Sequence, residues 1–268
     1  MRAPAVAGAF YPADPAVLTA TVDELMDTVQ VPDGEALAAA YVVPHAGYRY
    51  SGPTAAYVYA RLRYHAERVD RVVVLGPAHR VPLRGAAVPV ADRWRTPLGV
   101  VDLDTGTAER LAMQGLAVAS DVPHEPEHSI EVQVPFLQRV RHEKPPLVAP
   151  ICVGQCPAEE VAAIIDEAAG PDALVLCSTD LSHYLTEAQA RQQDDATAAA
   201  IVDLAPERVG LRDACGVFAL RGLLHWARER GGHAQLLDLC TSADTGGTPD
   251  RVVGYCAAAV GKPGRNPA

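Results

Sequence analysis

Two patterns of apolar and polar residues occur along this chain. Short runs of consecutive apolar residues, rich in β-branched side chains, occupy positions 41–43, 72–75 and 174–177, and such runs are typical of strands buried on both faces of a sheet. Residues 15–29 instead carry apolar side chains three and four positions apart, which predicts an amphipathic helix. The alternation of the two patterns predicts an α/β fold in which a central, mostly parallel sheet is flanked by helices.

Local signals mark where the elements begin and end. Asp14-Pro15 is a strong helix start, because Asp caps the first turn and Pro suits the first helical position. Thr186 with Gln189 forms a capping box, which predicts a helix to about residue 204. Further helices are expected after Pro53 to about residue 67 and at 105–114, 130–141, 157–169 and 215–230, and further strands at 86–90, 147–153, 233–240 and 251–260.

Composition limits the class of protein. The 268 residues are 49% hydrophobic and 21% charged, which fits a globular protein with a sizeable core. No repeat or linker divides the chain, so we expect one domain over residues 1–268 with a frayed tail from Lys262. The formal net charge of -10 argues against nucleic-acid and anionic-membrane partners. The chain has no signal-peptide pattern and no membrane-spanning window, so we expect a cytoplasmic protein.

Metal-competent side chains follow three of the predicted buried strands. His45 comes after the run 41–43, His79 follows 72–75, and Asp180 and His183 follow 174–177. Because the carboxyl ends of parallel strands meet at one edge of a sheet, these side chains are expected to form one pocket there. A single histidine of this kind is more often structural, and the coincidence of three favours a site.

For other candidate residues, the sequence alone leaves two interpretations open. Cys215 is expected at a helix N-terminus, where a thiolate is favoured as a metal ligand or nucleophile, but a buried thiol fits equally well. His124 and His128 are four residues apart, as in helical zinc sites, although Pro126 between them argues against a helix. Trp94 is expected in a loop as a wall of the pocket. The chain has no Gly-x-Ser-x-Gly or Gly-x-Gly-x-x-Gly motif, so serine-hydrolase and dinucleotide-binding functions have no support.

Seven short motifs occur in the order found in the Memo family, and the chain resembles that family over nearly its whole length. The motifs are Gly8-Ala9-Phe10-Tyr11-Pro12, Pro44-His45-Ala46-Gly47-Tyr48, Leu75-Gly76-Pro77-Ala78-His79, Thr96-Pro97-Leu98-Gly99, Glu127-His128-Ser129-Ile130-Glu131, Ser178-Thr179-Asp180-Leu181-Ser182-His183 and Cys215-Gly216. The family is named for a mediator of receptor-driven cell motility. Its bacterial and archaeal members are often called AmmeMemoRadiSam system protein B, which implies a radical-SAM protein as a partner.

The resemblance implies a fold similar to that of the class III extradiol dioxygenases. Carried over residue by residue, it implies metal binding by His45, His79 and Cys215. It also implies that His183, oriented or charge-tuned by Asp180, acts as the general acid or base. The residues expected around the ligands or at the pocket rim are Phe10, Tyr11, Tyr48, Trp94, Glu127 and His128.

These expectations favour a metal-dependent redox enzyme that acts on an unknown small molecule. The expected cofactor is one metal ion, Fe(II) first, then copper, then zinc. Two alternatives remain, a zinc-dependent hydrolase with the same ligands and a non-catalytic protein whose pocket binds a peptide or partner protein. Family members often continue Cys-Gly with a basic residue and a nearby proline, whereas this chain has Val217-Phe218-Ala219, so its substrate contacts are expected to differ more than its metal ligands.

Overall fold

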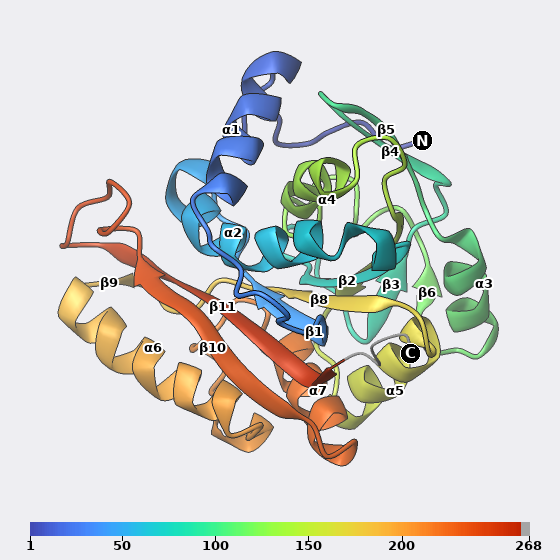
Figure 1. Ribbon diagram of the computed structural model, residues 1–268. Coiled ribbons are helices and arrows are strands. Elements are labelled where there is room, and N and C mark those ends of the chain that lie inside the picture. Colours follow the sequence, from blue (N-terminus) through green and yellow to red (C-terminus); the bar gives the residue numbers. More distant parts are fainter. Residues whose placement is uncertain (264–268) are drawn as a thin grey trace.

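A mixed sheet forms the centre of the molecule (Figure 1). In the computed structural model, which describes residues 1–263, this sheet has nine strands in the order β10-β11-β1-β8-β2-β7-β3-β6, with β9 paired to β11. Its strands are β1 Ala38–Val43, β2 Arg71–Pro77, β3 Ala86–Val88, β6 Val118–Ala119, β7 Leu147–Val153, β8 Leu174–Ser178, β9 His183–Leu185, β10 His233–Thr241 and β11 Val252–Pro263. The neighbours β1, β8, β2 and β7 run parallel, whereas β11 joins β1 in the antiparallel sense. The predicted α/β fold with parallel central strands is confirmed.

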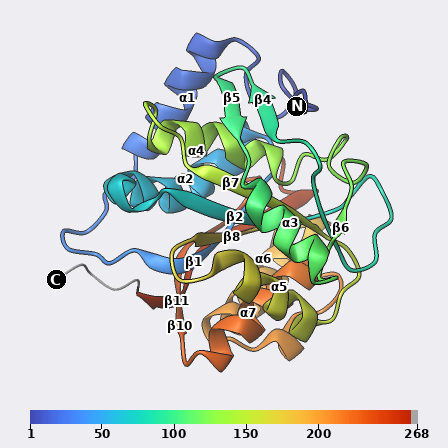
Figure 2. The same ribbon diagram turned by 90° about the vertical axis from the view of Figure 1, so that its right-hand side faces the viewer.

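Helices cover both faces of the sheet (Figure 1, Figure 2). One face packs against α1 Pro15–Asp27, α2 Tyr48–Tyr64, α4 Val134–Val140 and the hairpin of β4 Arg93–Thr96 and β5 Gly99–Asp102. The other face packs against α3 Thr105–Met113, α5 Ala158–Ala169, α6 Glu187–Val202 and α7 Val217–Glu229. Single 3-10 turns are η1 Ala66–Arg68, η2 Glu131–Gln133 and η3 Pro206–Arg208. Because both faces are covered, the central strands are apolar at successive positions.

Most predicted boundaries lie close to the observed ones. Asp14 caps α1 through a hydrogen bond of 2.9 Å from the amide of Val17, and the capping box of Thr186 and Gln189 opens α6. The helix expected after Pro53 in fact begins at Tyr48, and Pro53 lies inside it. Pro53 has no amide hydrogen, so α2 lacks one helical hydrogen bond there.

Four short strands and the chain end differ from the expectations. The hairpin of β4 and β5 was not predicted, and neither were the short strands β6 and β9. The tail expected from Lys262 is wrong at its start, because β11 continues to Pro263, which pairs with Ala38. Residues 264–268 lie outside the described part of the chain. Within the described residues, no helix combines the length and apolarity needed to cross a lipid bilayer.

The parallel centre of the sheet determines where the candidate residues lie. In the register between β1 and β8, Val43 pairs with Ser178, and between β2 and β8, Leu75 pairs with Cys177. Three adjacent strands therefore end at almost the same level. The segments that follow them, starting at residues 44, 78 and 179, meet at this edge, as predicted.

Candidate metal centre

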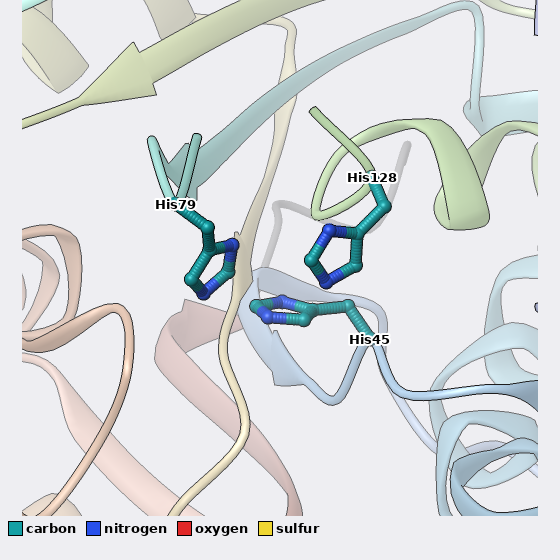
Figure 3. Close-up of side chains that lie close together, drawn as sticks. All are labelled: His45, His79 and His128. Carbon is teal, nitrogen blue, oxygen red and sulfur yellow. The ribbon is translucent and has the colours of Figure 1, made fainter. Parts of the chain in front are cut away.

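Three histidines gather at the edge where β1, β8 and β2 end (Figure 3). His45, His79 and His128 each offer a ring nitrogen, and these nitrogens lie within 4.8 Å of one another. His45 is 1% exposed, while the side chains of His79 and His128 are 28% and 13% exposed. The group is therefore closed on the protein side and reachable from solvent past His79.

His128 comes from a loop, and close packing brings that loop to the strand ends. The hydroxyl of Ser129 donates a 2.8 Å hydrogen bond to the carbonyl of Pro77 at the end of β2. A Cβ atom on Gly76 would lie 2.7 Å from Oγ of Ser129 and 2.8 Å from Cγ1 of Ile130. Gly76 is thus needed because the loop that carries His128 lies directly on the strand.

Hydrogen bonds determine which nitrogen of His45 carries a proton. Nδ1 of His45 lies 3.0 Å from Oγ of Ser178. That hydroxyl donates its one hydrogen to the carbonyl of Ser129 at 2.6 Å and accepts from Nε2 of Gln133 at 2.8 Å. It can therefore only accept from His45, so Nδ1 is protonated and Nε2 has a free lone pair.

Glu127 has the same effect on His79. Its Oε1 lies 2.9 Å from Nδ1 of His79 and accepts from the amides of His128 and Ser129, both at 2.9 Å. Burial opposes ionisation of this carboxyl, but the hydrogen bond and charge of His79 and the backbone hydrogen bonds outweigh it and lower the pKa of Glu127 to about 2. An ionised carboxylate only accepts, so Nδ1 of His79 carries a proton, and in the neutral ring that binds a metal the lone pair is on Nε2.

The pKa values of two imidazoles of the group are lowered. Burial, followed by the proximity of His79 and His128, lowers the pKa of His45 well below its usual value. Burial also lowers the pKa of His128 to about 4, although Glu127 acts in the opposite direction. Metal ions bind only the neutral ring. Three imidazoles whose ring nitrogens lie within 4.8 Å of one another, two of them with a proton held on Nδ1, are a donor set that fits a single metal ion.

Cys215 lies beside this group. Its Sγ is 3.2 Å from Nε2 of His45, and the amide of Asp180 donates to it at 3.3 Å. Burial and the carboxylate of Asp180 raise the pKa of Cys215 to about 12, so the free thiol is neutral at pH 7. The sulfur is close enough to His45 to be a candidate fourth ligand. The ligand atoms that all lie within 4.8 Å of one another belong to the three histidines. Cys215 as a ligand stays a prediction.

Gly216 explains how Cys215 reaches the strand ends. A Cβ atom at Gly216 would lie 2.9 Å from Cβ of Thr179 and 3.1 Å from the carbonyl of Ser178. The hydroxyl of Thr179 accepts a 2.9 Å hydrogen bond from the amide of Gly216. The Cys-Gly pair thus lets the start of α7 lie against the end of β8.

The two predicted acid-base residues flank the same strand end. Oδ1 of Asp180 accepts a 2.7 Å hydrogen bond from the amide of His45, and burial raises its pKa to about 6. Nδ1 of His183 donates to the carbonyl of Leu181 at 2.8 Å, which leaves a lone pair on its Nε2. His183 is near enough for its charge to lower the pKa of both Asp180 and His45. Their catalytic roles stay predictions.

The predicted aromatic residues have three different surroundings. Phe10 packs on His128 with ring centroids 4.6 Å apart and so forms part of the wall of the group. Tyr11 and Tyr48 are buried behind it, where they donate to Glu131 and to the carbonyl of Val132, both at 2.6 Å. Trp94 is not in a loop but in β4, fully buried under the guanidinium of Arg2.

A buried ion pair connects the N-terminal segment to the loop of His128. Arg2 donates to the carbonyls of His124 and Glu127 at 2.8 and 2.7 Å, and its Nη1 lies 2.7 Å from Oε2 of Glu131. Glu131 in turn accepts from the amides of residues 5 and 6 at 2.7 and 3.0 Å. The carbonyl of Phe10 accepts from the amide of Tyr48, three residues after His45. Residues 2–11 therefore link the loops that carry His45 and His128.

Comparisons with known proteins agree with this architecture. The family described as Memo-like protein matches residues 2–259. This chain belongs to the Memo family. Its relatives include MEMO1 family proteins of Methanosarcina mazei, 36% identical over 96% of this chain and 98% of the relative, and of Archaeoglobus fulgidus, 35% identical over 95% and 97%. A MEMO1 family protein of Aquifex aeolicus is 34% identical over 95% and 97%.

Similarity to solved structures supports the fold of this Memo family chain. An uncharacterized protein from Escherichia coli is similar with a TM-score of 0.51 and 12% identity, over 82% of this chain and 98% of that one. At this level of identity the likeness concerns the fold alone.

The histidine group differs from the predicted ligand set in one residue. His128 was expected around the ligands or at the pocket rim, because Pro126 argued against a helical pair of His124 and His128 and the resemblance gave the ligand positions to other residues. The structure brings His128 as close as the two strand-end histidines. The adjacent Glu127 was the available signal, since a carboxylate beside a histidine often orients metal ligands.

Proposed function

We propose that this Memo family protein is a metalloenzyme that uses one metal ion, Fe(II) or copper, for redox chemistry on a small molecule. The observation that carries the proposal is that hydrogen bonds fix the position of the ring proton in two of the histidines. Ser178 and Glu127 keep the protons of His45 and His79 on Nδ1, so both Nε2 lone pairs are available within the group that also includes His128.

The donor types favour a redox metal. Imidazole suits iron, copper and zinc, and a thiolate shifts the preference toward copper. Cys215 is 3.2 Å from Nε2 of His45, so its sulfur is available if the thiol proton is lost on metal binding. A bound ion of this kind supplies Lewis acidity and a one-electron redox couple.

The remaining residues of the site provide proton handling and exclusion of water. We assign His183 as general acid or base, because its Nδ1 is fixed by the carbonyl of Leu181 and its Nε2 is then the nitrogen that can exchange a proton with a ligand. Asp180 lies close enough for the charge of His183 to lower its pKa, and it holds the loop of His45 through that residue's amide. Phe10 shields His128 from water on one side.

A zinc-dependent hydrolase is the second candidate. Three histidines are a known ligand set of catalytic zinc, and the group of three found here has that composition. This alternative needs no redox role for Cys215. It predicts zinc as the bound ion and turnover that does not depend on oxygen.

Metal content of anaerobically purified protein separates these functions. Near-stoichiometric iron or copper is expected in the wild type, lost in His45→Ala and retained in His142→Ala, which removes an exposed histidine. Metal-dependent oxygen consumption with small phenolic compounds would then support redox activity. Stoichiometric zinc would favour the hydrolase. A wild type that binds no metal even after reconstitution would overturn both and leave a non-catalytic binding protein.

A further inference from the structure

A cleft of about 590 Å³ opens next to the histidine group. Ala78, which precedes His79, and Cys215, which contacts His45, both line it. Its volume is within the range of about 300–1,000 Å³ that is usual for small-molecule sites. A molecule bound in this cleft would therefore lie against Cys215 and the segment that leads into His79.

The lining of the cleft combines apolar and polar surface. Its apolar residues include Pro77, Leu83, Val153 and Phe218. Phe218 belongs to the first turn of α7, which begins at Val217, so the positive end of that helix dipole lies at the same wall. The cleft thus offers an apolar wall to a ligand that also contacts polar groups.

One charged side chain lines the cleft among the described residues, and it is Arg84. Arg84 is exposed and forms no ion pair with any residue of the described chain. In a protein with a formal net charge of -10, a cation without an acidic partner is available to an anionic ligand.

The backbone on both sides of Arg84 is held firmly. The amide of Gly85 donates to the carbonyl of Gln155 at 2.8 Å, and the amide of Gln155 donates to the carbonyl of Leu83 at 2.9 Å. A Cβ atom on Gly154 would lie 2.1 Å from the carbonyl oxygen of Leu83, so glycine is required for this close approach. Arg84 is thus presented from a fixed segment at the side of the cleft.

We propose that this cleft binds the substrate of the histidine site, and that the substrate is a small carboxylic acid whose carboxylate pairs with Arg84 and whose hydrocarbon part packs on the apolar wall. A carboxylate matches one guanidinium in charge and in the spacing of its two oxygens, whereas a doubly charged phosphate would need further cations. That the bound acid is a substrate rests on the proposed function. The binding of the acid in the cleft does not require a metal.

Two probes of equal shape test the charge preference. 3-Phenylpropionate and 3-phenylpropionamide differ in charge at one end, and their Kd values are measured by calorimetric titration of the metal-free full chain, so that no carboxylate can bind through a metal. The acid is expected to bind at least about tenfold more tightly than the amide. Arg84→Gln should abolish this difference, and Phe218→Ala should weaken both probes to a similar extent.

Arg95→Gln is the matched control, because Arg95 is an exposed arginine of β4 that does not line the cleft. It should keep the preference for the acid. Equal affinity of the two probes, no binding of either at millimolar concentration, or an unchanged preference in Arg84→Gln would overturn the proposal. Arg84→Gln should also bind metal like the wild type. A preference for the acid in a protein that binds no metal would uphold the cleft as a carboxylate site and refute only the proposed function.

Discussion

Two histidine–cysteine pairs of this protein have similar chemistry and very different surroundings. Sγ of Cys215 lies 3.2 Å from Nε2 of His45, and Sγ of Cys152 lies 3.4 Å from Nδ1 of His124. Both histidines are 1% exposed. In both pairs burial lowers the pKa of the histidine and raises the pKa of the thiol.

The difference lies in what surrounds the second nitrogen. Nε2 of His124 donates to the carbonyl of Ala87 at 3.2 Å, and its ring stands edge-on to Trp94. The only lone pair of the neutral ring is on Nδ1 and faces Cys152, so both ring nitrogens of His124 have partners within the core. The lone pair of His45 faces Cys215 at a point where two more histidines meet. Buried histidine and cysteine alone do not make a metal site; it needs several unprotonated nitrogens at one point.

The largest effect is expected when His45 and His124 are replaced in turn. His45→Ala should lower metal affinity by roughly 100-fold or more, because one ligand of a four-ligand zinc site carries about 3 kcal/mol of the total. His124→Ala should leave metal affinity within about threefold of wild type and lower the free energy of unfolding by about 2–4 kcal/mol. Competition with a fluorescent chelator and urea denaturation measure the two quantities. Equal metal loss in both variants would contradict the distinction.

Replacement of Glu127 tests whether the position of the ring proton of His79 affects metal affinity. Glu127→Gln should lower metal affinity by about 10–100-fold, because the side-chain NH2 group of glutamine would face one of the backbone or ring N–H donors that the carboxylate now accepts from. Glu125→Gln, which changes an exposed neighbour, is the control and should bind metal normally. The same chelator competition measures both. Wild-type affinity in Glu127→Gln would mean that another group holds His79.

A buried and a partly buried ion pair allow a comparison of site support with scaffold support. Arg2–Glu131 joins the loops of the histidine group, whereas Arg61–Glu35 lies at the far end of α2. Arg2→Met should lower the free energy of unfolding by about 3–5 kcal/mol, since it leaves the buried carboxylate of Glu131 without its partner. Arg61→Met should lower it less, because the side chain of Glu35 is 23% exposed and can be solvated. Only Arg2→Met should also lower metal affinity, by several-fold, and alter the visible spectrum of the cobalt-substituted protein. Identical cobalt spectra in the two variants would show that Arg2 supports the fold alone.

The pH dependence of stability should be substantial and shared by both regions. The pKa of His124 and of His128 is about 4 in the folded chain and about 6.5 when unfolded. Between these values the unfolded state binds more protons, so the free energy of unfolding of the metal-free protein should fall as pH is lowered, by up to about 1.4 kcal/mol per pH unit for each histidine. Denaturation between pH 7 and 4 measures it. His124→Phe should reduce the slope by up to one proton, and an unchanged slope would mean that His124 is not held neutral.

Much of the scaffold was predictable because its signals are local. The apolar runs at 72–75 and 174–177 identified β2 and β8, and Asp14-Pro15 identified the start of α1. The hairpin of β4 and β5 was missed because its strands have only four residues each, and the burial of Trp94 in it depends on Arg2, which is distant in sequence.

The sequence by itself determined which strands would release histidines and that these strands would run parallel in one sheet. Periodicity and chain breaks encode this, so His45 and His79 could be placed at one edge from their positions after β1 and β2. Only the tertiary structure decided that His128 completes the group and that His124, four residues earlier, does not. The reason is physical: the two residues share a loop, but Ser129, which follows His128, packs on Gly76 at the end of β2, whereas His124 itself contacts Ala87 and Cys152. Such contacts between distant segments leave no periodic signal in the chain.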